Sequence, residues 1–295
     1  MNPLLWTSKS LRKISDAVKE LGYNVSHKLV GVILNEEGYS LQSNRKTDEG
    51  THVDRDAQFE FINTKVTSFL NAGNPVISVD CKKKENVGNF KNSGKEWSEK
   101  HSPTEVKVYD FIDKDLGKAI PYGVYDIQNN EGFVNVGISH DTASFAVASI
   151  RRWWQEMGCL NYNNCKRMLI TADGGGSNSS RSKLWKKELE LLSKELDIEI
   201  NVCHFPPGTS KWNKIEHRLF SYISINWRAK PLTSLQIIIN LISSTKTEKG
   251  LKVKAELDSK NYPKGTLVTE EEIEKINMYR NEFHGEWNYT INSNS

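Results

Sequence analysis

The sequence predicts an α/β protein in which a mixed five-stranded sheet is flanked by helices and preceded by a small all-α unit. Three observations support this fold class. Short β-branched runs alternate with segments of helical periodicity over residues 75–227. Two of those runs end in an aspartate. The first 46 residues carry two short amphipathic patterns separated by a turn.

Two helices are predicted near the N terminus, over residues 7–22 and 26–38. In the first, apolar residues recur at three- and four-residue intervals, and Gly22 ends the pattern. Ser26 is expected to cap the second helix. The expected buried stripe of that helix consists of Leu29, Val30, Ile33 and Leu34. Two short helices joined by a tight turn are typical of a helix-turn-helix.

This N-terminal segment is the candidate DNA-binding domain. Its 46 residues hold a surplus of three positive charges, which equals the net charge of the whole chain. In a helix-turn-helix the second helix places its first residues in the major groove, and here these are Ser26, His27 and Lys28. Two amphipathic helices of mixed charge are, however, more often plain packing units.

A polar stretch at residues 42–55 is predicted to be a linker, so the expected domains are residues 1–46, a linker and helix at 47–74, and a main domain at 75–295. The elements expected after the linker are a helix at 59–70, strands at 76–79, 106–111, 119–126 and 133–138, a helix at 141–157, a strand at 167–172, a helix at 181–196, a strand at 198–204, and helices at 210–227 and 270–281. This order is used by RNase H-like folds, and other mixed α/β arrangements also fit it.

Composition narrows the functional classes. With 37% hydrophobic and 26% charged residues the chain resembles a soluble globular protein. No apolar run approaches the roughly 20 residues needed to cross a bilayer, and the N terminus has no export signal. The four cysteines are too widely spaced for a zinc knuckle, so we expect reduced thiols. We therefore expect a cytoplasmic protein without a membrane partner.

Three carboxylates stand at informative positions. Asp80 and Asp173 each follow a predicted buried strand, and Glu216 lies near the start of a predicted helix. An acidic residue at the end of an apolar strand is costly unless it is paired or binds a cation. Magnesium prefers such oxygen ligands, and two ions held together can catalyse phosphoryl transfer. Taken singly, each aspartate is also an ordinary turn former.

The residues beside two of these acids are unusual. Lys82, Lys83 and Lys84 follow the first acid and would hold DNA phosphates, or form a solvated charge run. Gly174 and Gly175 follow the second acid. Without side chains they would let the backbone approach a bulky substrate, or they form a plain tight turn.

The segment HFPPGTSKWNKIEH at residues 204–217 resembles the last-acid motif of mariner-related DDE transposases. The chain as a whole has a stronger resemblance to the Rhodopirellula-type DDE transposase family of bacterial insertion sequences. The strings that carry this resemblance are SVDCKKKENVGNFKNSGKEW, GKAIPYGVYD, ITADGGGSNSSRSKLWKKEL, HFPPGTSKWNKIEHRLFSYISINWR and FHGEWNYTI. They extend the resemblance over residues 7–290.

The resemblance implies an insertion-sequence transposase with a helix-turn-helix, an RNase H-like domain and a catalytic, metal-binding triad of Asp80, Asp173 and Glu216. It implies double-stranded DNA, both element ends and target, as the partner, and a homodimer that acts on paired ends. The expected cofactor is a pair of Mg²⁺ ions bridged by Asp80, with Mn²⁺ as the alternative. Two departures are Cys81, where the family has Thr, and a shorter N terminus, so we expect a shortened copy.

Further residues around the last acid are candidate contacts. Asn213 and His217 would orient Glu216 or touch DNA, although a simple hydrogen-bonded role fits His217 as well. Trp212 is expected to pack in the core. Expected phosphate contacts are Lys211, Lys214 and Arg218. Two alternative functions are a catalytically inactive or truncated element-derived DNA-binding protein, and an RNase H-like nuclease or resolvase that cleaves without joining.

Overall fold

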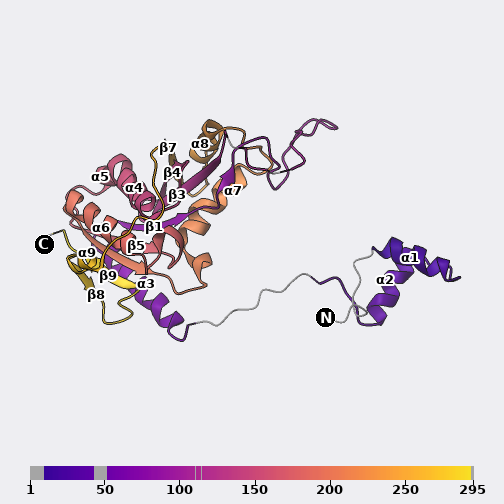
Figure 1. The fold of residues 1–295 in the computed structure, drawn as a ribbon, viewed down its shortest axis with the longest axis horizontal. Coiled ribbons are helices and arrows are strands. Elements are labelled where there is room, and N and C mark those ends of the chain that lie inside the picture. The colour runs from indigo at the N-terminus through magenta and orange to yellow at the C-terminus, as the bar shows by residue number, and fades with distance from the viewer. Residues whose placement is uncertain (1–9, 43–51, 110, 114, 294–295) are drawn as a thin grey trace. The chain divides into compact units, whose positions relative to one another are not determined.

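The structure is a computed structural model that describes residues 10–42, 52–109, 111–113 and 115–293. The chain forms two compact units, Met1–Gly50 and Thr51–Ser295 (Figure 1). Residues 43–51 of the predicted linker lie outside the described residues. No helix in the described ranges is both long and apolar enough to cross a membrane.

The N-terminal unit contains α1 (Leu11–Glu20) and α2 (His27–Glu36). Ser26 caps α2 by accepting a hydrogen bond from the Leu29 N–H at 3.1 Å. The Ser15 hydroxyl donates to the Val25 carbonyl at 2.7 Å and so ties α1 to the turn before α2. Of the expected stripe, Val30 is buried and Leu34 half-buried, whereas Leu29 and Ile33 are exposed, so the predicted stripe is only partly correct.

The larger unit is built on one mixed sheet. Its strands are β1 (Val76–Cys81), β2 (Glu85–Asn86), β3 (Lys118–Asp126), β4 (Glu131–Gly137), β5 (Arg167–Ala172), β6 (Glu199–His204), β7 (Lys252–Asp258), β8 (Met278–Arg280) and β9 (Asn288–Ile291). The sheet order is β7-β4-β3-β1-β5-β6-β9-β8, and β2 pairs with β3.

The centre of this sheet has RNase H-like topology. Strand β1 pairs antiparallel with β3, which pairs antiparallel with β4. On its other side β1 runs parallel to β5, which runs parallel to β6. The predicted five-stranded sheet is therefore present as β4-β3-β1-β5-β6. It is extended by β7, parallel to β4, and by β9 and β8 beyond β6.

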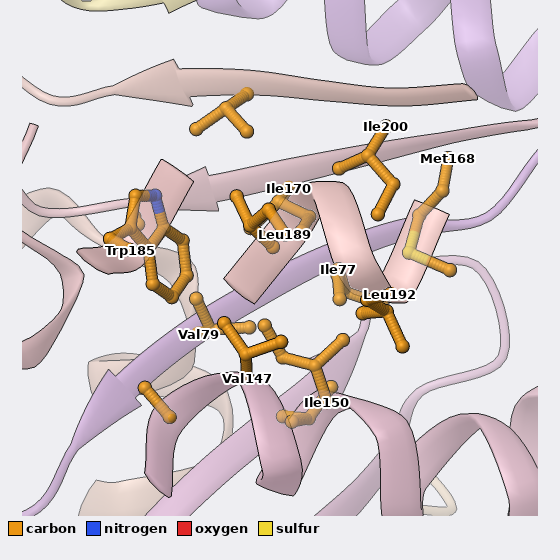
Figure 2. Close-up of a cluster of buried hydrophobic side chains, with 14 of the residues drawn as sticks. Ile77, Val79, Val147, Ile150, Met168, Ile170, Trp185, Leu189, Leu192 and Ile200 are labelled. Atoms are coloured by element: carbon orange, nitrogen blue, oxygen red, sulfur yellow. The ribbon is translucent and has the colours of Figure 1, made fainter. Parts of the chain in front are cut away.

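Helices cover both faces of the sheet. They are α3 (Arg55–Asn71), α4 (Ala143–Trp153), α5 (Cys159–Asn161), α6 (Lys183–Leu196), α7 (Ser221–Asn226), α8 (Leu235–Ser243) and α9 (Glu270–Glu274). Helices α4 and α6 pack on one face, where β-branched residues of β1 and β5 meet Val147, Leu189 and Trp185 (Figure 2). Helices α7 and α8 pack on the other face against β3 and β4, and α3 covers β1, β5 and β6 there. The alternation of side chains along β1 explains both layers. Ile77 and Val79 face α4 and α6, whereas Val76 and Ser78 face the opposite layer.

Several element predictions are wrong. Residues 106–109 and 111 form no strand, and Val108 is 88% exposed because no strand of the described residues pairs with this segment. The helix expected at 270–281 ends at Glu274, and β8 follows it. The helix expected at 210–227 is broken into a 3-10 turn at Ser210–Trp212, a π-helical turn at Glu216–Phe220, and α7.

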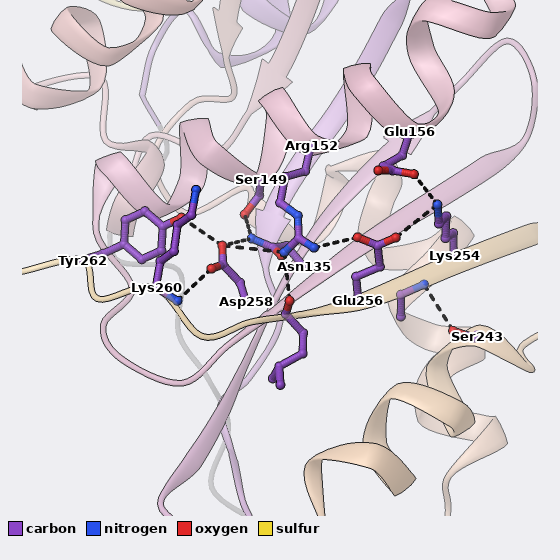
Figure 3. A network of polar contacts seen from close by, with 12 residues as sticks. Asn135, Ser149, Arg152, Glu156, Ser243, Lys254, Glu256, Asp258, Lys260 and Tyr262 are labelled. Carbon is purple, nitrogen blue, oxygen red and sulfur yellow. Dashed lines mark hydrogen bonds and ion pairs between the residues drawn. The ribbon is translucent and has the colours of Figure 1, made fainter.

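A buried polar network joins β4, α4 and β7 (Figure 3). Asp258, whose side chain is 3% exposed, accepts hydrogen bonds from Asn135 Nδ2 and the Tyr262 hydroxyl, both at 2.9 Å. Arg152 lies 3.8 Å from the same carboxylate. Burial alone would raise the pKa of Asp258, but these donors and the Lys260 N–H hold that pKa below its ordinary value of 3.8.

Replacing Asp258 by Asn should destabilise the protein at neutral pH by about 1–3 kcal/mol, because buried donors lose a charged acceptor. A carboxylate whose pKa is lowered by folding contributes stability above its ordinary pKa and loses it as the pH falls through the lowered value. The difference from wild type should therefore shrink as the pH falls below 3.8 and vanish only below the lowered pKa of the folded state. Urea unfolding at neutral and acidic pH measures it. Glu256→Gln, at a more exposed carboxylate of the same network, is the control, and an equal loss in both variants would contradict the prediction.

Candidate active site

Asp80 and Asp173 lie side by side at one edge of the sheet. Strands β1 and β5 are parallel, with Val79 opposite Ala172. Asp80 and Asp173 are the next residue of each chain, so both acids stand near the carboxyl ends of adjacent parallel strands, where Asp80 is still paired with Gly123 of β3. Their side chains follow the alternation that places Ser78 on the face covered by the Glu216 segment.

Glu216 is held near them by hydrogen bonds to β1. The Ser78 hydroxyl donates to Asn213 Oδ1 and accepts the Ile215 N–H at 3.0 Å. Asn213 Nδ2 donates to the Val79 carbonyl at 3.1 Å. Asn213 is fully buried and extended, and this is why the expected continuous helix is interrupted before Glu216. The third acid is thus positioned by the strand that carries the first.

Asn213→Ala should lower activity more than stability would explain. It removes the link between β1 and the Glu216 turn, at a cost of about 1–3 kcal/mol for the unpaired groups. Loss of such a positioning contact typically lowers activity 10–100-fold. The rate of DNA cleavage per folded protein molecule measures the effect. Asn226→Ala is the matched control, because Asn226 also bonds a backbone carbonyl but at the end of α7. Equal activities in the two variants would show that Asn213 has only a structural role.

Burial and neighbouring carboxylates raise the pKa of all three acids. Burial and then the neighbouring Asp173 raise the pKa of Asp80 from 3.8 to about 8, and Glu216 contributes further. Burial also raises the pKa of Asp173. The pKa of Glu216 is raised by burial and, more weakly, by Asp173, while Lys82 opposes this. Such a concentration of buried negative charge favours a bound cation.

The hydrogen bonding of Asp173 leaves room for that cation. Its carboxylate accepts hydrogen bonds from the Gly175 N–H and from Asn178. Its Oδ1 atom is buried and has no hydrogen-bond partner among the residues that the structure describes. A buried carboxylate oxygen without a donor is a suitable ligand for a hard divalent ion. The residues present therefore fit a magnesium-type site.

Two candidate functional residues were not predicted from the sequence. Asp141, just before α4, adds a fourth negative charge that raises the pKa of Asp80 and of Asp173, and it pairs with Lys84 at 3.2 Å. His204 is fully buried at the end of β6, and its Nδ1 donates to the Asp173 carbonyl at 2.9 Å. Neither residue is an acid at the end of a predicted strand, which is the pattern that marked the first two acids. The contact partner of each comes from a distant segment of the chain.

The lysines predicted to contact DNA have different environments. Lys82 is largely buried, with its ammonium 4.6 Å from the centre of the Trp227 ring and 3.8 Å from Glu85. Burial lowers the pKa of Lys82. Lys83 and Lys84 are exposed and line a hollow of about 290 Å³ whose further basic residues are Lys91 and Lys118. This hollow, rather than Lys82, offers positive charge to a polyanion.

The residues around Glu216 are mainly exposed. Lys211, Lys214, His217 and Arg218 face solvent. The Nε2 atom of His217 contacts the Lys211 carbonyl, which leaves Glu216 to be positioned by Asn213. Trp212 is 49% exposed, so its predicted core position is wrong.

A side chain in place of either glycine after Asp173 would not clash with the rest of the protein. A Cβ at Gly174 would come no closer than 3.7 Å to another heavy atom, and one at Gly175 no closer than 3.9 Å. Neither has a positive φ. Their proposed advantage is therefore access to the acids for a bulky ligand, and not a backbone conformation that only glycine adopts.

Comparisons with known proteins bear on this site. No curated protein matches the chain. Solved structures of a transposase named Mos1 are remote: the strand transfer complex has 13% identity and a TM-score of 0.45. The paired-end complex with the left transposon end has 12% identity and a TM-score of 0.41. In both, the aligned part covers 78% of this chain and only 64% of Mos1.

The match to a protein family covers more of the chain than the matches to solved structures do. The family described as "Rhodopirellula transposase DDE domain" matches residues 1–293. That match includes the three acids and both helices of the N-terminal unit. The chain therefore belongs to the Rhodopirellula transposase DDE-domain family.

Proposed function

We propose that this protein is a DDE transposase that cleaves DNA at the ends of an insertion sequence and joins those ends to target DNA. The observation that carries the proposal is the placement of three half-buried carboxylates near the carboxyl ends of two central strands, with Asp80 and Asp173 on the adjacent parallel chains of β1 and β5. Family membership over residues 1–293 supports the same reaction. Phosphoryl transfer needs little covalent chemistry from side chains, so a site made of carboxylates suits it.

Asp80, Asp173 and Glu216 would hold two Mg²⁺ ions, or Mn²⁺ in their place. When bound, these ions supply activation of the attacking hydroxyl and neutralise charge on the phosphodiester. Asn213 and Ser78 hold the Glu216 turn against β1, and His204 holds the backbone of Asp173. Lys84 balances the charge of Asp141 beside the triad.

DNA contacts are assigned to exposed basic residues. Near the acids, Lys83 and the exposed Lys211, Lys214 and Arg218 would contact phosphates. In the N-terminal unit, Ser26, His27 and Lys28 begin α2 and are exposed, as a helix that reads the major groove requires. The division into a DNA-binding domain at 1–46, a linker at 47–74 and a catalytic domain from 75 is part of this proposal. So is a homodimer, because an element has two ends to join.

The deciding experiment incubates the full chain with labelled double-stranded DNA that carries the element's own ends. Cleavage and joining to a target duplex are followed separately, with Mg²⁺, with Mn²⁺ and with a chelator. The proposal expects both reactions, each dependent on the divalent ion. Cleavage without joining would identify a nuclease or resolvase instead. Binding of the ends without any cleavage would identify an inactive DNA-binding protein.

A further inference from the structure

Two histidines and a carboxylate meet where α3 begins and where the C-terminal hairpin turns. His52 and Asp54 precede α3, and His284 lies between β8 and β9. Ligand atoms of these three residues all lie within 4.8 Å of one another. His284 Nε2 is 3.0 Å and His52 Nδ1 is 3.9 Å from Asp54 Oδ2. We propose that this cluster binds a divalent transition-metal ion, with Zn²⁺ as its best match.

The donor set determines the metal. Two imidazole nitrogens and one carboxylate oxygen suit zinc and similar first-row ions, whereas magnesium prefers oxygen ligands alone. Ligands about 2.0–2.2 Å from a tetrahedral zinc ion lie about 3.3 Å apart. The separations of 3.0 and 3.9 Å to Asp54 Oδ2 lie on either side of that value. The cluster thus differs in chemistry from the all-carboxylate active site.

Glu286 supports His284 as a ligand. Its Oε1 atom lies 2.7 Å from His284 Nδ1. A carboxylate at this distance keeps the proton on Nδ1, so Nε2, which faces Asp54 Oδ2, is the nitrogen that would bind an ion once the ion displaces its proton. Metal-binding histidines commonly have such a carboxylate partner on the second ring nitrogen.

Aromatic packing holds the histidine rings in place. The His284 ring stacks on Trp287 with centroids 4.3 Å apart and an interplanar angle of 21°. His52 meets the same indole edge-on at 4.9 Å. His284 also has a φ of +48°, an uncommon backbone conformation, and its carbonyl accepts the N–H groups of Trp287 and Asn288. The turn therefore presents the His284 ring in one orientation.

Asp54 is available as a ligand. It occupies the N-cap position of α3, where an aspartate normally accepts a backbone N–H, but its side chain makes no capping hydrogen bond. The carboxylate is directed to His284 instead. His52 Nδ1 accepts the Asp54 N–H at 3.2 Å, and a bound ion would replace that weak bond. Both side chains are more than one third exposed, so they can adjust to an ion without disturbing the core.

The test titrates Zn²⁺ into the full chain by calorimetry, in excess Mg²⁺ and in an Asp173→Asn background that weakens metal binding at the active site. Co²⁺ as a second probe reports nitrogen ligation through its visible absorption. We expect one Zn²⁺ per chain and at least tenfold weaker binding in Asp54→Asn and in His52→Ala. Glu286→Gln should weaken binding 10–100-fold. Asp56→Asn is the matched control, two residues from Asp54 and with a 93% exposed side chain, and should bind normally.

Either of two results would overturn the proposal. One is the absence of Zn²⁺ binding by the folded protein. His284 would then act as a charged bridge between Asp54 and Glu286, and Asp54→Asn would lower the melting temperature regardless of metal. The other is undiminished binding in both Asp54→Asn and His52→Ala. DNA cleavage is not measured here, so failure of this proposal leaves the transposase proposal untouched.

Discussion

Asp173→Asn is expected to abolish DNA cleavage while the fold survives. The substitution keeps the size of the side chain but removes one of the three carboxylates that are proposed to bind the metal. The loss should exceed the roughly 10–100-fold typical of an outer contact. Stability without metal should change little, because burial already raises the pKa of this carboxyl and makes its charge unfavourable. Metal-dependent cleavage and thermal unfolding, measured on the same preparations, test both parts.

Asp141→Asn is the matched control for that result. Asp141 contributes charge to the same cluster but is paired with Lys84 and follows no strand of the parallel pair. Its replacement should reduce cleavage by no more than an outer contact does. If Asp141→Asn were as damaging as Asp173→Asn, the assignment of a three-acid site would be wrong.

Gly123→Ala should impair both stability and catalysis. Gly123 is paired with Asp80 across β1 and β3. A Cβ there would lie 2.5 Å from a Phe220 ring carbon and 2.8 Å from the Ile215 side chain, so the Glu216 turn must move. Overpacking of this kind costs about 1–3 kcal/mol. Displacement of a catalytic group by about 1 Å can reduce the rate about 100-fold. Denaturant unfolding and cleavage per folded molecule measure the two effects.

Gly137→Ala separates the two effects. A Cβ at Gly137 would lie 2.6 Å from the Phe145 ring, which belongs to α4 on the opposite face of the sheet. Its cost in stability should be comparable, but the Glu216 turn is not displaced. Similar cleavage rates in Gly123→Ala and Gly137→Ala would refute the argument that Gly123 controls the position of Glu216.

The sequence predicted the centre of the fold because its strands are uniform in burial. Residues 76–79 and 168–172 are mainly apolar and buried throughout, and such runs are readable without knowledge of their partners. Strand β7 has a half-exposed, lysine-rich sequence and depends on its pairing with β4, so its local pattern gives no clear signal. Residues 106–109 have strand-like composition, but they form no strand, and their neighbour is a loop in which the Asn89 carbonyl accepts the Lys107 N–H.

The candidate site was predictable to a similar degree. The positions of Asp80 and Asp173 follow from the ends of two strands. The break at Asn213 could not be foreseen, because its side chain bonds to β1, more than a hundred residues earlier. The roles of Asp141 and His204 likewise depend on contacts between distant segments.

The bond between Asn213 and β1 also affects when, during synthesis, the proposed active site is completed. A ribosome releases β1 and the Asp173 loop well before the segment that carries Glu216, so the site of a nascent chain lacks one acid. The last acid is locked in place only when Asn213 reaches Ser78 and Val79 in an already assembled sheet. Any DNA-cutting capacity would therefore arise only late in synthesis, and prematurely terminated chains would be inert.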